Sequence, residues 1–380
     1  MLGPQSYVIF GLLLAIFVAG TYLQRRAGHL AVQIGAAAMS FIVAALFGMA
    51  VVNKFYDYYQ TWGNIVADLT GTQPGVTALP KVPPPGKLQQ VIGGSDAAKN
   101  GRLISLDLTG SKSGISRPGL VFLPPQYFQS HYANYRFAVI ELLHGSPGRP
   151  YDWVGALHVT TALDALVSRH HARPMVLVMP DVNGGVQLPS SQCLNEATGP
   201  QTDTYLSVDV PADVTASFRV QPMGRHWGIA GYSEGGFCAA NLALRHPSHY
   251  AVAASMSGYF QPLPIDGVDP FAGNASARLA NDPMWLAERH VAGQPMPAFW
   301  LMAGLSDRAD VLDVRTMAAL LRRWEPVPTI FVPRVQHTFA AWIPAVPRML
   351  AWMSPRLTAG LLLPTSAPSP ASTTRSAPGR

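Results

Sequence analysis

Cysteine is scarce in this sequence, which has only Cys193 and Cys238. Two thiolates are too few for a tetrahedral thiolate zinc site. In an exported domain the pair would form one disulfide between the segment after residue 190 and the helix after residue 233. Two free, buried thiols are the alternative. The cysteines therefore predict a candidate disulfide and no zinc centre.

Charged residues are also few, at 13% of the chain, and the net charge of +6 is spread along it. No run of Lys and Arg with interleaved aromatic residues occurs, so we expect no nucleic-acid partner. The sequence has no HExxH motif, no dinucleotide-binding glycine fingerprint and no P-loop. We therefore predict neither a metal nor an organic cofactor.

Apolar residues are abundant near the N-terminus, where residues 7–23 and 30–53 lack charge. A spanning helix needs about 20 apolar residues. A cleaved signal peptide is one alternative, but "MLGPQS" has no basic residue; buried helices are another. Residues 1–55 thus predict two transmembrane helices. Arg25 and Arg26 lie in the connecting loop, with only Lys54 beyond the second span, which favours a cytoplasmic loop, both chain ends outside, and thus an extracytoplasmic domain after the second span.

The rest of the chain divides by composition. Residues 56–100 are predicted to be a juxtamembrane segment and linker: an aromatic stretch over 54–70 is suited to a membrane interface, and a Pro- and Gly-rich linker or extended arm follows over 71–95. Residues 101–355 alternate short apolar runs with amphipathic stretches, which predicts a mostly parallel sheet covered by helices on both faces. Residues 261–295 break this rhythm as an insertion. Residues 356–380 are predicted to be a disordered tail.

The stretch "GIAGYSEGGF" places Ser233 in the spacing G-x-S-x-G. The spacing alone is weak, because glycine and serine are common. Here an apolar strand precedes it and an alanine-rich helix follows, which is the context of a nucleophile elbow. The sequence therefore predicts that Ser233 is a catalytic nucleophile.

A serine nucleophile needs a base and an orienting acid, and in this fold the acid follows the serine in the chain and the histidine base follows the acid. Among the downstream histidines, His337 comes directly after the last predicted strand and is the predicted base. Asp307 comes three residues after the strand that ends at Gly304, and we predict it as the acid. Asp310 and Asp313 are the alternatives, interpreted as residues of the next helix.

The oxyanion of the reaction needs two N–H donors. We predict the backbone N–H groups of Glu234, directly after the serine, and Ser146, in the His-Gly turn of "ELLHGSPGRPYDW". His144 is expected to shape this turn. Aromatic residues near these motifs are candidates for substrate binding: Trp153, Tyr232 and Tyr259.

Six segments resemble the family of esterase D, the enterochelin esterases and the mycobacterial mycolyltransferases: "SGISRPGLVFLPPQY", "LLHGSPGRPYDW", "GIAGYSEGGFCAANLALRHP", "SMSGYF", "GLSD" and "QHTFAAWIPAVPRMLAWM". The resemblance covers about residues 101–355. It implies an α/β-hydrolase fold with a Ser-Asp-His triad, matched here by Ser233, Asp307 and His337. The two-span anchor before such a domain is similar to membrane-bound esterase-like proteins of actinobacteria.

We therefore predict a membrane-anchored serine esterase acting on small or lipid-like esters. An acyltransferase that passes the acyl group to a sugar or glycerol hydroxyl is the alternative. The resemblance places a glutamate at the acid position of the mycolyltransferases, where this chain has aspartate. A non-catalytic envelope binding protein is a third hypothesis, which a missing triad residue would have supported.

Overall fold

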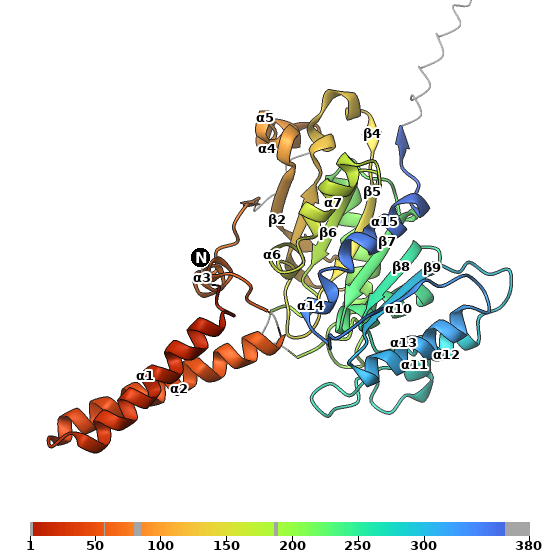
Figure 1. Ribbon diagram of the computed structural model, residues 1–380. Helices are drawn as coiled ribbons and strands as arrows, with labels where there is room; N and C mark the ends of the chain where they lie inside the picture. The colour runs from red at the N-terminus through yellow and green to blue at the C-terminus, as the bar shows by residue number, and fades with distance from the viewer. Residues whose placement is uncertain (1–2, 57, 80–84, 186–188, 362–380) are drawn as a thin grey trace, which may run out of the picture.

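The computed structural model describes residues 3–56, 58–79, 85–185 and 189–361. A helical pair at the N-terminus joins a domain built on one large sheet (Figure 1). The predicted tail beyond residue 361 and the linker residues 80–84 lie outside the described residues.

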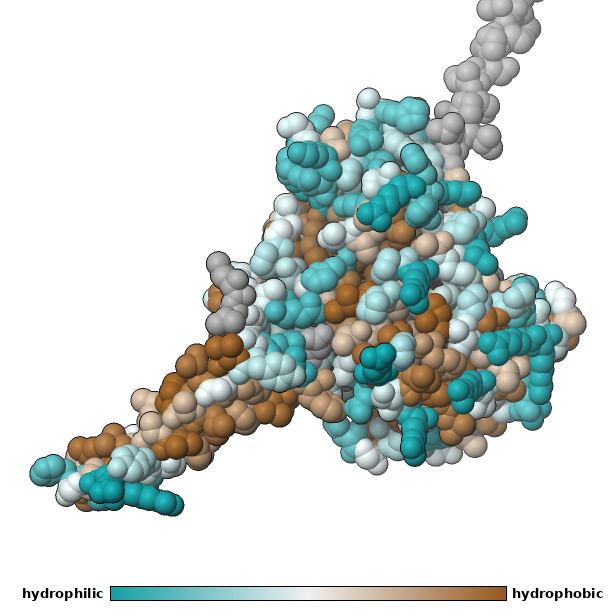
Figure 2. Space-filling model, viewed as in Figure 1, coloured by the Kyte–Doolittle hydropathy of each residue, from teal (hydrophilic) through white to brown (hydrophobic). Residues whose placement is uncertain are grey.

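The helical pair consists of α1 (Tyr7–Arg26) and α2 (Leu30–Tyr56). Both helices are long and apolar enough to cross a membrane. Small residues lie where they pack: a side chain on Gly20 would come within 2.6 Å of the Ser40 hydroxyl. Such close approach through small residues is typical of helix pairs in lipid. Figure 2 shows apolar side chains along the pair and hydrophilic ones at its free tip.

The sheet has nine strands in the order β1-β2-β3-β6-β5-β7-β8-β9-β10. They are β1 (Val76–Ala78), β2 (Arg102–Thr109), β3 (Ser116–Leu123), β5 (Ala138–Leu143), β6 (Met175–Pro180), β7 (Gly224–Tyr232), β8 (Tyr250–Met256), β9 (Ala298–Gly304) and β10 (Thr329–Val332). Only β3 pairs antiparallel with its neighbours β2 and β6. The short β4 (Tyr135–Arg136) and β11 (Gly360–Leu361) form a separate pair.

Helices cover both faces of this sheet (Figure 1). Successive side chains of a strand point to opposite faces, and in β6 both sets are apolar: Val176 and Val178 enter one core, and Leu177 enters the other. The first core includes α10 (Glu234–Arg245) and α13 (Arg308–Leu321), and the second includes α7 (Val159–Ser168) and α15 (Val346–Met353). The mostly parallel α/β architecture is therefore as the sequence predicts.

The remaining helical segments are short. They are α3 (Trp62–Thr70), α4 (Pro85–Ile92), α5 (Ser95–Asn100), α6 (Asp152–Gly155), α8 (Thr202–Thr204), α9 (Val210–Ser217), α11 (Ala275–Leu279), α12 (Pro283–Glu288) and α14 (Phe339–Trp342), with single turns at Pro125–Phe128, Ser130–Tyr132, Tyr205–Asp209 and Ser354–Arg356. Both α11 and α12 fall in the predicted insertion.

The Pro- and Gly-rich segment differs from the prediction of a linker. Its strand β1 pairs in parallel with β2 and extends the sheet edge. Further along, Leu88 and Ile92 of α4 are buried in the core of the domain. Apolar side chains at these positions find a surface to cover, and burying them outweighs the local preference for irregular chain. The described parts of this segment therefore pack against the sheet and the core.

Candidate active site

Ser233 lies at the sharp turn between β7 and α10. Its backbone has φ 56° and ψ −123°, a conformation that is strained for a residue with a side chain. The Ser233 N–H donates to the Met256 carbonyl, and the Ser233 carbonyl accepts from Gly236 at the start of the helix. These bonds hold the strained turn in place, with the serine at the carboxyl end of a central strand.

Neighbouring backbone segments approach this turn so closely that only glycine, which has no Cβ, fits at several positions. A Cβ on Gly231 would lie 2.0 Å from the Gly235 carbonyl oxygen, and one on Gly235 would lie 2.2 Å from that of Leu143. A Cβ on Gly236 would lie 3.0 Å from the Gly258 Cα. Contacts below 3 Å with backbone cannot be relieved by a rotamer change. The motif glycines therefore let the strand, turn and helix pack together.

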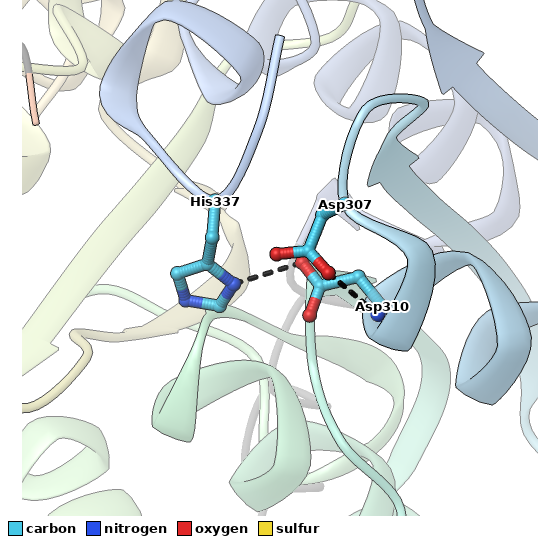
Figure 3. A group of neighbouring side chains, drawn as sticks. All are labelled: Asp307, Asp310 and His337. Atoms are coloured by element: carbon cyan, nitrogen blue, oxygen red, sulfur yellow. Dashed lines mark hydrogen bonds and ion pairs between the residues drawn. The ribbon is translucent and has the colours of Figure 1, made fainter. Parts of the chain in front are cut away.

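A chain of hydrogen bonds joins three side chains at this turn. His337 Nε2 lies 2.8 Å from Ser233 Oγ, and His337 Nδ1 lies 2.8 Å from Asp310 Oδ2. His337 follows β10, and Asp310 lies in the first turn of α13 (Figure 3). When Nδ1–H donates to the carboxylate, Nε2 is free to accept from the serine hydroxyl. The geometry is that of a nucleophile, a base and an orienting acid.

The aspartate that is hydrogen-bonded to His337 is thus Asp310, whereas the sequence interpretation favoured Asp307 for this contact. Asp307 is the N-cap of α13, where its Oδ1 accepts from the Ala309 and Asp310 N–H groups. Side chains on a helix lean toward its N-terminus, so Asp310, within the first turn, leans back toward the loop that carries His337. Asp313, the other alternative, lies further along α13; burial raises its pKa, as do Asp310 and Asp307.

Asp307, Asp310 and His337 form a cluster whose potential ligand atoms all lie within 4.8 Å of one another. Figure 3 shows both carboxylates on the same side of the imidazole. The two carboxylates therefore lie beside the ring that Asp310 contacts through its hydrogen bond.

The imidazole of His337 also contacts Trp342. The two rings lie 5.2 Å apart, edge to face, and the Trp342 indole N–H donates to Ser257 Oγ. This contact fixes the plane of the ring against which His337 rests. Trp342 was not singled out by the sequence, although it lies only five residues after the histidine in a helical pattern.

The segments that carry the two predicted oxyanion donors both lie next to Ser233. Glu234 is the first residue of α10, where an N–H has no acceptor in the preceding turn of the helix. The turn that contains Ser146 passes close to the nucleophile, since a Cβ on Gly145 would lie 3.0 Å from the Ser233 Cβ. His144 holds this turn: its Nδ1 donates to the Gly145 carbonyl, and its Nε2 accepts from Val182 N–H.

The side chain of Glu234 has a second role that the sequence did not indicate. It is buried, and it accepts from the Asn183 amide and from the Gln192 backbone N–H. Burial raises the pKa of this carboxyl. The disulfide between Cys193 and Cys238 joins the same two segments, the loop after β6 and α10. Two independent links thus hold this loop against the nucleophile's helix.

Two of the three predicted substrate-binding aromatic residues belong to the core instead. Trp153 is fully buried and packs edge to face on Tyr232, whose ring also contacts Trp342. The Tyr232 hydroxyl donates to the buried Asp152. Large aromatic rings directly beneath the elbow fill the space between sheet and helices, so neither ring is open to substrate. Tyr259 is half-buried and stacks on Phe237 at 4.8 Å.

Residues 111–353, more than half of the chain, match the family model described as "Putative esterase". The chain therefore belongs to this esterase family and is an enzyme of the serine hydrolase class. The sequence-based resemblance is confirmed at the level of the family.

Individual relatives are more distant. An uncharacterized protein of Corynebacterium glutamicum is 24% identical over 83% of this chain and 74% of its own length. An esterase of Mycobacterium tuberculosis is 28% identical over 37% of this chain and 29% of its own length.

Among solved structures, a ferulic acid esterase aligns with a TM-score of 0.60 at 20% identity, over 68% of this chain and 99% of that one. An S-formylglutathione hydrolase from Agrobacterium tumefaciens aligns with a TM-score of 0.55 at 18% identity, over 68% and 96%. These likenesses confirm the predicted α/β-hydrolase fold.

Proposed function

We propose that this chain is a membrane-anchored serine esterase that works through an acyl-enzyme on Ser233, with His337 as the base and Asp310 as the acid. The observation that carries the proposal is the hydrogen-bonded series from Ser233 Oγ through His337 to Asp310. Each partner is within the reach that proton transfer requires.

In the first half of the reaction, Ser233 Oγ attacks the ester carbonyl carbon while His337 Nε2 takes the hydroxyl proton. Asp310 accepts the Nδ1 proton in a hydrogen bond and stabilises the imidazolium. The backbone N–H groups of Glu234 and Ser146 stabilise the oxyanion of the tetrahedral intermediate. The intermediate collapses as the alkoxide leaves with the proton from His337, and the acyl group remains on Ser233.

In the second half, water gives a proton to His337 and attacks the acyl carbon. Collapse of the second intermediate returns the proton to Ser233 Oγ and releases the acid. We favour water over a sugar or glycerol hydroxyl as the acceptor of the acyl group. The resemblance places a glutamate at the acid position of the mycolyltransferases, whereas the residue that contacts His337 here is an aspartate.

Tyr259 is our candidate for contact with the ester. The substrate is a small or lipid-like ester near a membrane, because α1 and α2 are suited to anchor the domain there. The basic residues Arg25 and Arg26 favour a cytoplasmic loop, which would put the catalytic domain outside.

Labelling with a fluorophosphonate probe tests the activated serine. Membranes carrying the intact chain should be labelled, and those carrying Ser233→Ala or His337→Ala should not. Ser130→Ala, a change of the same type in the turn Ser130–Tyr132 outside the proposed triad, serves as the control and should leave labelling intact. Equal labelling of all four, or labelling of none, would remove the assignment of the nucleophile and base.

A further inference from the structure

The helix α3, directly after the apolar pair, carries an exposed apolar stripe. Trp62, Val66 and Leu69 are 47%, 56% and 82% exposed. Their spacing of four and three residues places them on one face of a helix. The other side faces the domain: Ala67 is buried, and the Asn64 amide donates to the Gly155 carbonyl. An exposed apolar stripe on a docked helix marks an interaction surface.

The position of α3 along the axis of the α1–α2 pair is fixed by hydrogen bonds between the residues just before α3 and the end of α2. The Tyr59 N–H donates to Asn53 Oδ1 at 2.6 Å, and the Asn53 amide donates back to the Tyr59 carbonyl at 3.0 Å. The Gln5 amide, just before α1, also donates to the Tyr59 carbonyl. Three residues after Tyr59, α3 begins at Trp62. Three residues span at most about 10 Å, so the start of α3 at Trp62 lies close to Tyr59. The helix α3 therefore begins at the end of the α1–α2 pair that is nearest the domain (Figure 1).

Exposed aromatic residues gather at the same level. Tyr7, Phe55 and Tyr56 are each more than half exposed at this end of the two helices. Aromatic side chains concentrate where a membrane meets water. The stripe of α3 therefore continues a surface that already has the composition of a membrane interface.

We infer that α3 lies in the interfacial layer of a lipid bilayer, with Trp62, Val66 and Leu69 inserted among the acyl chains and headgroups. The inference rests on the membrane anchor proposed above. The sequence of α3, WGNIVADLT, has no Lys or Arg, so insertion depends on its apolar face. Neutral phosphatidylcholine should therefore suffice as the partner.

Docking of this segment ties the active site to the same plane. The Tyr58 hydroxyl donates to Asp152, which also accepts from Tyr232 beside the nucleophile. The Tyr58 ring packs on Phe339, two residues after His337. These contacts with the sequence neighbours of Ser233 and His337 hold that end of the sheet at a set distance from α3, and thus from the bilayer.

A fluorescent probe tests the inference without using enzyme activity. The full chain is placed in neutral phosphatidylcholine vesicles with a nitrobenzoxadiazole group on Leu69→Cys, on Leu312→Cys or on Ile42→Cys. Leu312 is 65% exposed on α13 and is the matched control, and Ile42 is 54% exposed within α2. Brominated lipids should quench the Leu69 and Ile42 probes at least twofold more strongly than the Leu312 probe.

Quenching at Ile42 with none at Leu69 overturns the role of α3 and leaves the anchor standing. Shielding of the Leu69 probe from water without quenching by lipid also overturns it and identifies a protein partner. Quenching at neither Leu69 nor Ile42 removes the anchor and the inference together. Because fluorophosphonate labelling is scored separately, loss of the esterase assignment is distinguishable from each result.

Discussion

At the scale of single residues, the contact between Asp310 and His337 distinguishes two aspartates that are three positions apart. We expect Asp310→Asn to lower kcat/KM for a soluble ester by roughly 10²–10⁴-fold, because the amide cannot stabilise the imidazolium as a carboxylate does. Its thermal midpoint should change little. Hydrolysis rates and thermal unfolding of the purified full chain measure the two effects.

Asp307→Asn is the matched control, since asparagine also serves as an N-cap. It should retain most of the activity, while Asp307→Ala should lose about 1 kcal/mol of stability. A loss of activity in Asp307→Asn as large as that in Asp310→Asn would assign the acid role to the pair of aspartates and contradict the role of Asp310 alone.

A buried carboxyl on β5 predicts a pH-dependent stability. Glu141 is fully buried and accepts from the Tyr250 hydroxyl, and burial raises its pKa from 4.5 to about 8. The folded state therefore holds a proton that the unfolded state releases above pH 4.5. Stability should fall as the pH rises through this window. Glu141→Gln should remove the dependence and raise the thermal midpoint at pH 8 by roughly 5 °C or more.

Thermal midpoints of both proteins from pH 5 to pH 8 measure this effect. A parallel course of the two curves would mean that Glu141 titrates normally in the fold. The variant should keep its fluorophosphonate labelling, because Glu141 contributes no atom to the triad.

Residue types and spacing lead to Ser233 and His337, because a strained turn needs glycines and a strand end supplies a place for the base. The acid is harder to find. Counting from the strand end leads to Asp307, but both aspartates suit a helix start. The choice depends on which one caps the helix and on the direction of the other side chain. That information is contained in the backbone path and not in the spacing.

At the scale of elements, the loop after β6 depends on its links to α10. The Cys193–Cys238 bond closes a loop of 45 residues, which in the chain-entropy model contributes about 4 kcal/mol. Replacing both cysteines with serine should therefore lower the thermal midpoint by roughly 10 °C. Reductant should lower that of the natural protein similarly and leave the variant unchanged. A midpoint of the natural protein that ignores reductant would argue that this link adds no stability.

The buried strands and the helices between them are predictable because each has an apolar run of suitable length and a boundary of Gly or Pro. The strand Val76–Ala78 and the helix α4 are not. Three residues are too few for a periodic pattern, and prolines on either side favour a linker. Their structure arises from the sheet edge and core surface that they cover, which local sequence does not describe.

At the scale of the whole molecule, Arg25 and Arg26 predict the topology; the structure places them in the last turn of α1, beside the loop in which the sequence predicts them. A phosphatase that is active only outside the cytoplasm should be active when fused to the C-terminus, because the proposed orientation puts that end outside. Substituting Arg25 and Arg26 with glutamine should reduce this activity severalfold as part of the population inverts. Full activity of a phosphatase fused between the two helices, with none at the C-terminus, would reverse the orientation.

The pairing of β1 with the sheet edge also sets how far the enzyme reaches. A flexible chain of the 45 residues from 56 to 100 would let a domain wander about 35 Å from its anchor point. Here β1 pairs with the sheet, and Tyr58 and Asn64 are hydrogen-bonded to the domain. These contacts leave the domain little freedom to move away from the helix pair. With the helix pair in a bilayer, Ser233 would stay at a nearly constant distance from the membrane while the protein diffuses. It would therefore reach only a thin layer parallel to the membrane. The distance of an ester carbonyl from the membrane surface would then be the first condition for its hydrolysis. An ester held outside that layer would not react, even if its shape fitted the site.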